Sequence, residues 1–133
     1  PFDHIARSAC WRIEPSVPHR YTLLLHTAAA NRFEHDDNRI VIHCCTHRLD
    51  IHLVTSSPFT LHQDHYGCHP RLQIEQTTER ARFVMLLHPR RHDDPEAIFH
   101  ATLNEDVVVT EVRVGDDAAR HVFQTTNATR RGG

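Results

Sequence analysis

The densest group of potential metal ligands is the segment from His62 to His69, which contains His62, His65, Cys68 and His69. Imidazole and thiolate are the ligands that zinc prefers, and spacings of three and four residues would suit a loop wrapping an ion. Asp64 could be a further ligand or could orient one. The spacing matches no standard zinc motif, however, and the alternative is an ordinary loop between strands. We therefore expect no resident metal or other cofactor, with His62, His65 and His69 as weak candidates.

A second set of chemically capable residues flanks the first apolar run of the sequence. His19 and Arg20 precede this run, and His26 follows it. A guanidinium group binds carboxylates and sulfates through paired hydrogen bonds, and a neighbouring histidine could contact the same acidic sugar. The alternative is that these side chains cap strand ends by bonding to the backbone. We predict His19, Arg20 and His26 as substrate-binding residues.

Carboxylates occur as adjacent pairs, which raises the question of general acid and base catalysis. Besides Asp36-Asp37, the pairs are Asp93-Asp94, Glu105-Asp106 and Asp116-Asp117. All of them fall at predicted turns, where short acidic side chains bond to the local backbone. A glycosidase pair is therefore not favoured. Serine-nucleophile motifs, phosphate-binding loops and dinucleotide fingerprints do not occur either. The sequence predicts no catalytic residue in this chain.

The cysteines suggest neither a zinc ribbon nor a thioredoxin-type site. Cys10, Cys44, Cys45 and Cys68 form no pair separated by two residues. Cys44 and Cys45 are adjacent on a predicted strand, so they should point to opposite faces and not bond to each other. We expect free thiols that are buried or half-buried.

Short apolar runs with a period of two must position these residues. In Arg48–Val54, Leu49, Ile51 and Leu53 alternate with polar side chains, as in a strand with one buried face. No long span has a helical period, and polar turns such as Asp36-Asp37-Asn38 separate the runs. Loops are predicted at His62–Pro70 and Pro89–Pro95. The predicted strands are Ala9–Ile13, Tyr21–Leu25, Arg39–Cys45, Arg48–Val54, Phe59–Gln63, Leu72–Gln76, Ala81–Leu87, Ala97–Leu103, Asp106–Val114 and Arg120–Thr125.

This pattern of about ten short strands predicts an all-β fold, an antiparallel β-sandwich. The 133 residues are enough for one domain. We expect an irregular lead-in over 1–18, which could be the end of a truncated strand, the sandwich over 19–126, and a mobile tail over 127–133. Val112 belongs to the core only if a bulge lies near Thr110. The predicted core is Leu23, Leu25, Ile40, Ile42, Leu49, Ile51, Leu53, Leu72, Ile74, Phe83, Met85, Leu87, Val107, Val109, Val112 and Val122.

Composition and charge exclude some classes of partner. The formal net charge is −2, so no global basic field exists and binding to nucleic acid is not expected. No apolar run approaches the length of a membrane span, so no membrane partner is expected. The 15 basic residues are all arginine; a surface suited to oxyanions would explain this, but codon usage in a GC-rich genome is the favoured explanation. Protonation of part of the 14 histidines below about pH 6.5 would make the chain cationic.

The order of motifs from His19 onward carries a family resemblance. His19-Arg20-Tyr21 precedes an apolar run and His26-Thr27, and a turn then leads into Asn38–Ile42 and Arg48–Leu53. This order resembles the C-terminal β-sandwich of heparinase II/III-like polysaccharide lyases. Arg82–Pro89 resembles another strand of the same sandwich, so the resemblance covers roughly residues 19–90.

The resemblance implies a specific role. Lyases of this kind join an α/α toroid to β-sandwich layers and cleave uronate-containing polysaccharides by β-elimination. Their catalytic residues lie on the toroid and at the sandwich start, which carries a His-x-His and a His-Asn segment. Neither segment occurs in this sequence. The resemblance therefore implies a non-catalytic C-terminal part that supports the cleft, binds acidic polysaccharide, and works with an N-terminal toroid region of the same secreted or periplasmic protein.

Two alternatives come from other functional classes. One is a free-standing carbohydrate-binding β-sandwich module, and a weaker one is a histidine-based metal-binding protein. Binding modules usually present a cluster of aromatic residues on one face, and Trp11 could stack on a sugar ring. Aromatic residues are only 7% of this chain and most fall at predicted core positions, which favours the lyase part. Enzymatic activity would then depend on the missing region, because this chain lacks the catalytic motifs.

Overall fold

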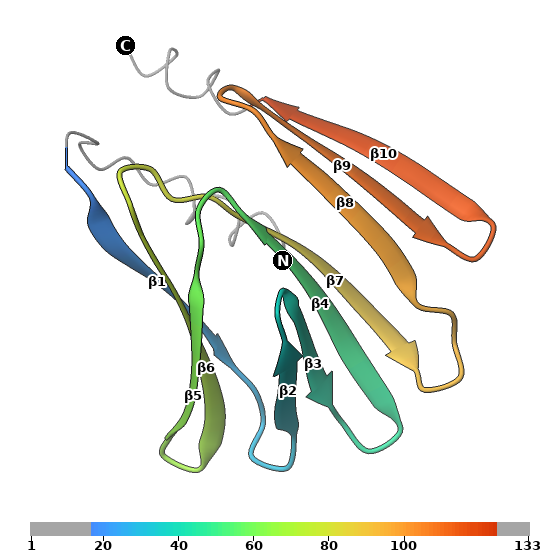
Figure 1. Ribbon diagram of the computed structural model, residues 1–133. Helices are drawn as coiled ribbons and strands as arrows, with labels where there is room; N and C mark the ends of the chain where they lie inside the picture. The colour runs from blue at the N-terminus through green and yellow to red at the C-terminus, as the bar shows by residue number, and fades with distance from the viewer. Residues whose placement is uncertain (1–16, 125–133) are drawn as a thin grey trace. The chain divides into compact units, whose positions relative to one another are not determined.

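The computed structural model describes residues 17–124, and Figure 1 shows them as a series of antiparallel strands. This range contains ten strands and no helix. The all-β, antiparallel β-sandwich expected from the sequence is thus confirmed. The chain divides into two compact units, one ending at His92 and the other beginning at Asp93. We call them the N-terminal and the C-terminal unit.

The N-terminal unit consists of two antiparallel sheets. One has the strand order β1-β6-β5, and the other has the order β2-β3-β4-β7 (Figure 1). Hairpins join β2 to β3, β3 to β4 and β5 to β6. β1 pairs with β6 and β4 pairs with β7, which lie further along the chain. The strands are β1 (His19–His26), β2 (Arg32–Asp36), β3 (Arg39–His43), β4 (His47–Thr55), β5 (Thr60–Tyr66), β6 (His69–Thr78) and β7 (Phe83–Arg91).

Apolar side chains from both sheets form the core of the N-terminal unit. Cross-strand rows explain its order: Ile40 pairs with Ile51, and Ile51 pairs with Leu87 on its other side. A period of two places every second residue of each strand in this layer. All core residues predicted for this unit are confirmed. The buried residues are Phe33, Ile40, Ile42, Ile51, Leu53, Leu72 and Ile74, and packed around them are Leu23, Leu25, Leu49, Phe59, Leu61, Phe83, Met85 and Leu87.

The C-terminal unit is a three-stranded meander of β8 (Ala97–Leu103), β9 (Val107–Val114) and β10 (Asp117–Gln124). In this unit, the prediction of which strand face is buried is wrong. Val108 and Thr110 are buried, whereas Val122 is 52% exposed. Three consecutive valines make both faces of β9 apolar, so the period alone does not identify its buried face. Val112 shares the face of Val108 in an unbroken register, and the expected bulge is not present.

Two segments of the N-terminal unit form strands where the sequence predicted none. The sequence does not predict β2, because Arg32–Asp36 contains a single apolar residue, Phe33. His62–Pro70 is not a loop, because it contains the end of β5, a tight turn at Gly67-Cys68, and the start of β6. Gly67 has a φ of +62°, which is the conformation that a first turn residue of a two-residue hairpin often needs.

The cysteine prediction also needs correction. Cys44 and Cys45 lie beyond the end of β3 in the turn before β4, and Cys68 lies in the turn before β6. All three are free, as expected, but they are exposed and not buried or half-buried. Cys10, Trp11, the strand predicted at Ala9–Ile13, most of the predicted lead-in and the predicted tail lie outside the described residues.

Candidate functional site

The outer face of the β1-β6-β5 sheet brings a set of polar and aromatic side chains together. Leu25 and Leu72 face the core, so the next pair in the register, His26 and Arg71, faces outward. Arg71 is in turn opposite Asp64 on β5, and Tyr66 ends that strand. We call His26, Asp64, Tyr66, Arg71 and Gln73 the Tyr66 cluster.

A bidentate ion pair fixes the centre of the Tyr66 cluster. Arg71 Nε donates to Asp64 Oδ1 at 2.8 Å, and Arg71 Nη2 donates to Oδ2 at 2.7 Å. Gln73 Nε2 also donates to Oδ2, at 2.9 Å. The hydrogen bonds from Arg71 lower the pKa of Asp64 from 3.8 to about 2, and the bonds to Asp64 raise the pKa of Arg71. The guanidinium is therefore held in one orientation by a carboxylate that is ionised at neutral pH.

Tyr66 is the exposed aromatic of this cluster, at 65% of its surface. The guanidinium carbon of Arg71 lies 5.7 Å from its ring centroid, and the His26 ring meets it edge-on at 5.9 Å and 89°. These contacts hold a mostly exposed ring in place. An aromatic face can stack on the C–H face of a sugar, while a guanidinium beside it can bind a carboxylate or sulfate.

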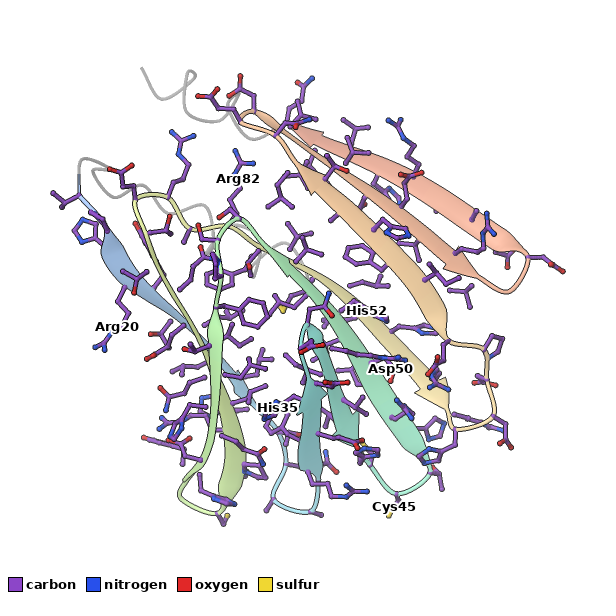
Figure 2. All side chains as sticks on the ribbon, in the orientation of Figure 1. Arg20, His35, Cys45, Asp50, His52 and Arg82 are labelled. Atoms are coloured by element: carbon purple, nitrogen blue, oxygen red, sulfur yellow. The ribbon has the colours of Figure 1, made fainter. Side chains whose placement is uncertain are left out.

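The structure separates the three predicted substrate-binding residues. His19 lies on the core side of β1 with Tyr21, whereas Arg20 points to the outer face. His26 shares that outer face, but it lies six residues from Arg20, about 20 Å along the strand. Figure 2 labels Arg20 at the far end of β1. Only His26 joins the Tyr66 cluster, and His19 instead contacts Tyr21, with ring centroids 6.4 Å apart.

The weak metal candidates do not converge on one point. His62 and His69 lie on the outer face of the sheet, whereas His65 pairs with Pro70 on the opposite face. Asp64 is engaged by Arg71. Across residues 17–124, no group of three or more histidine, cysteine or acidic side chains is placed to hold a metal ion.

A hollow, which we call the edge hollow, lies between β5 and β2, which are edge strands of the two sheets. Its volume is about 690 Å³. His35 on β2 pairs with the buried Ile40, so it points to the core side of its sheet, yet it is exposed at the open edge (Figure 2). Asp37 begins the following turn with a φ of +43°. The hollow is lined by His35, Asp37, Asn38, Thr55, Ser56, Ser57, Pro58, Phe59 and Leu61.

The wall of the edge hollow formed by the β4–β5 connection is fixed by hydrogen bonds. Thr55 Oγ1 donates to the carbonyl of Ser57 at 2.6 Å, and the buried Gln76 donates to the same carbonyl at 3.3 Å. Ser57 Oγ lies 3.2 Å from Thr78 Oγ1 and donates to it. The hydroxyls of Thr55 and Ser57 are therefore used within the β4–β5 connection and toward β6, which preorganises the shape of this wall.

The outer face of the other sheet contains a buried carboxylate among arginines. Asp50, labelled on β4 in Figure 2, has a fully buried side chain. It accepts hydrogen bonds from Arg48 Nε at 2.7 Å and Arg90 Nε at 2.6 Å, and Arg39 Nη2 lies at 3.6 Å. Burial raises the pKa of Asp50, but the hydrogen bonds from Arg90 and Arg48 outweigh this effect, so the net pKa is below 3.8. We assign this network a structural role.

The sequence did not identify Tyr66, Arg71 or the edge hollow, because each depends on a stretch of strand that was not predicted. The segment that contains Tyr66 was expected to be a loop, so its side chains had no predicted face. The pattern His62, Asp64, Tyr66 alternates with Leu61, Gln63 and His65, and treating it as a strand would have placed Asp64 and Tyr66 together. The edge hollow depends on His35, which shares the core-side face of β2 with Phe33, and β2 was not expected.

Comparisons with protein-family models, with curated proteins and with solved structures give no match to this chain. Residues 17–124 contain no helix that could cross a membrane.

Proposed function

We propose that this chain is a non-catalytic β-sandwich that binds acidic polysaccharide through the Tyr66 cluster. The observation that carries the proposal is the exposed Tyr66 ring held between His26 and Arg71. The resemblance to the C-terminal sandwich of heparinase II/III-like lyases suggests the same role, with catalysis supplied by a toroid region of the same protein. In that arrangement the sandwich supports the cleft and contacts the polymer outside the reacting bond.

The chemistry of the cluster matches a uronate or sulfated sugar. The ring of Tyr66 offers an apolar surface to the C–H groups of a pyranose. Arg71 uses Nε and Nη2 for Asp64, so its remaining guanidinium nitrogen, Nη1, is available for a ligand oxyanion. His62, which lies beside Gln73 on the same face, adds positive charge when it is protonated.

A free-standing carbohydrate-binding module is the second candidate. Tyr66 favours it, because such modules bind through exposed aromatic residues, and this ring is exposed where most aromatics were expected in the core. Both candidates bind sugar through the same cluster and differ in whether a toroid region accompanies the chain. A histidine-based metal-binding function has less support, because the candidate histidines lie on opposite faces of the sheet.

The test is calorimetric titration of the full chain with heparan sulfate, alginate and the neutral polymer dextran. Binding is expected for the acidic polymers and not for dextran. Tyr66→Ala and Arg71→Gln should each weaken binding by about tenfold, because each removes a direct contact. Phe123→Ala removes another exposed aromatic, on β10, and Arg113→Gln removes an exposed arginine on β9, so both serve as controls.

Equal affinity of the Tyr66→Ala variant and the parent chain would remove the Tyr66 cluster from the proposal. Equal binding to dextran and heparan sulfate would contradict the acidic specificity.

A further inference from the structure

The edge hollow has one side whose polar side chains are uncommitted, and an opposite side that combines apolar residues with hydroxyls already used in hydrogen bonds. His35, Asp37 and Asn38 line one side, and Pro58, Phe59 and Leu61 line the other. Among the described residues, the side chains of His35, Asp37 and Asn38 make no hydrogen bond or ion pair. An apolar surface facing a few free polar groups is the usual construction of a small-ligand site.

These free groups suit adjacent hydroxyls. The Asp37 carboxylate accepts hydrogen bonds only, whereas the Asn38 amide both donates and accepts. Two neighbouring hydroxyls of a pyranose can donate to the carboxylate and exchange bonds with the amide. The ring of Phe59, half-buried at the side of the hollow, offers a surface for the C–H groups of the same sugar.

The charge of the edge hollow selects against an acidic sugar. Asp37 is the only formally charged side chain among its lining residues if His35 is neutral, and no arginine lines it. A uronate or sulfate placed beside Asp37 would meet like charge. The Tyr66 cluster differs, because it presents a guanidinium.

The polar side of the hollow is preorganised by the turn that contains it. Asp37 has a φ of +43°, a left-handed conformation that Asp and Asn adopt more readily than most residues. The carbonyl of Asn38 accepts a hydrogen bond from the amide of Leu53 at 2.9 Å, which ties the turn to β4. The opposite wall is fixed by the hydrogen bonds of Thr55 and Ser57. A ligand therefore meets groups that need little ordering.

We propose that the edge hollow is a second binding site, which takes a neutral sugar residue through adjacent hydroxyls held by Asp37 and Asn38. The site is separate from the Tyr66 cluster and has the opposite charge preference. It does not depend on the acidic-polysaccharide binding proposed above.

The test is a titration of the ¹⁵N-labelled full chain, followed by two-dimensional NMR, with the methyl glycosides of glucose, galactose, mannose and N-acetylglucosamine. At least one glycoside should shift the amides of Asp37, Asn38 and Leu61 in a saturable way, with a Kd of about 1–10 mM. The methyl glycoside of glucuronic acid at pH 7 should shift the same amides at least about tenfold more weakly.

Asp37→Asn is the decisive variant, because Asn tolerates the left-handed turn and the substitution removes only the charged acceptor. It should weaken binding of the neutral glycoside by about tenfold or more. Asp116→Asn makes the same change in the β9–β10 turn and should leave the affinity unchanged. Tyr66→Ala should also leave it unchanged, which separates this site from the one proposed for acidic polymers.

Three outcomes would overturn the proposal. The first is no saturable shift at these amides with any neutral glycoside. The second is binding of the glucuronide as strong as that of its neutral counterpart. The third is an Asp37→Asn chain that keeps its fold, as judged by its spectrum, and binds as well as the parent.

Discussion

Asp50 illustrates how a single buried charge can depend on its neighbours. Its carboxylate is fully buried and is compensated by guanidinium groups from three different strands. Removing one member of a buried charged group leaves the others without compensation, which costs more than the intact group contributes. The arginines here outnumber the carboxylate, so the loss of Asp50 leaves like charges facing one another.

Asp50→Asn should therefore lower the free energy of unfolding by about 3–5 kcal/mol. The measurement is urea denaturation at pH 7, with Asp116→Asn in an exposed turn as the matched control, for which a change within about 0.5 kcal/mol is expected. A loss below about 1 kcal/mol for Asp50→Asn would contradict the structural role.

The same residue predicts a pH dependence with a defined sign. The pKa of Asp50 is lower in the folded chain than its ordinary value of 3.8. Its contribution to stability is therefore fully present above about pH 4 and is lost as the pH falls through the folded pKa. The stability difference between the parent chain and Asp50→Asn should shrink on acidification below about pH 4. A difference that grows in that range would have the wrong sign.

The pKa of Asp64 can be measured directly. Its pKa of about 2 means that the carboxylate should still be ionised at pH 3. A carboxyl-carbon NMR titration of the full chain measures this, and Arg71→Gln should raise the pKa towards 3.8, because the largest cause of the shift is the hydrogen bonding from Arg71. A pKa near 4 in the parent chain would show that the bidentate pair does not form in solution.

At the scale of elements, β4 anchors the N-terminal unit. Ile51 is 2% exposed and lies between Ile40 and Leu87 in its cross-strand row. Ile51→Ala should lower the free energy of unfolding by about 2–5 kcal/mol, because it removes buried methylene groups and leaves a cavity. Val122→Ala on β10 should change it by less than about 0.5 kcal/mol. Denaturant unfolding of both variants checks the contrast, and similar losses would mean that β10 is covered in solution.

How well the sequence predicts a strand depends on the spacing of the apolar residues in it. Leu49, Ile51 and Leu53 alternate with charged residues, so the strand and its buried face follow from the sequence. β9 contains valines on both faces, so a period of two does not identify which face is buried. β5 and β2 are mostly polar, and their strand conformation follows from pairing with β6 and β3. The Tyr66 cluster and the edge hollow depend on these two strands. Among their members, the sequence therefore predicted only His26 as a substrate-binding residue, and it named Asp64 only in connection with a metal.

At the scale of the whole molecule, the proposed role predicts no lyase activity from this chain alone. β-Elimination needs a base for the proton α to the uronate carboxylate, an acid for the leaving oxygen on the next carbon, and a group that neutralises the carboxylate, all around one sugar residue. The predicted residues His19 and His26 lie on opposite faces of β1, at its two ends. Incubation with heparan sulfate or alginate should give no rise in ultraviolet absorbance above a buffer control. Turnover that is lost on His19→Ala or His26→Ala would refute the non-catalytic role.

The exposed thiols have a consequence for the environment in which the molecule is kept. Cys44 and Cys45 lie at one hairpin tip and Cys68 at another, all without a disulfide partner. Thiols at exposed tips of different copies can reach one another, and an oxidant in the medium, such as dissolved oxygen, then oxidises two of them to a disulfide between chains. Without a reductant, stored protein should therefore accumulate covalent multimers, visible as a ladder on a non-reducing gel. A dye on Cys68 would lie two residues from Tyr66, where it could report polymer binding as a change in fluorescence.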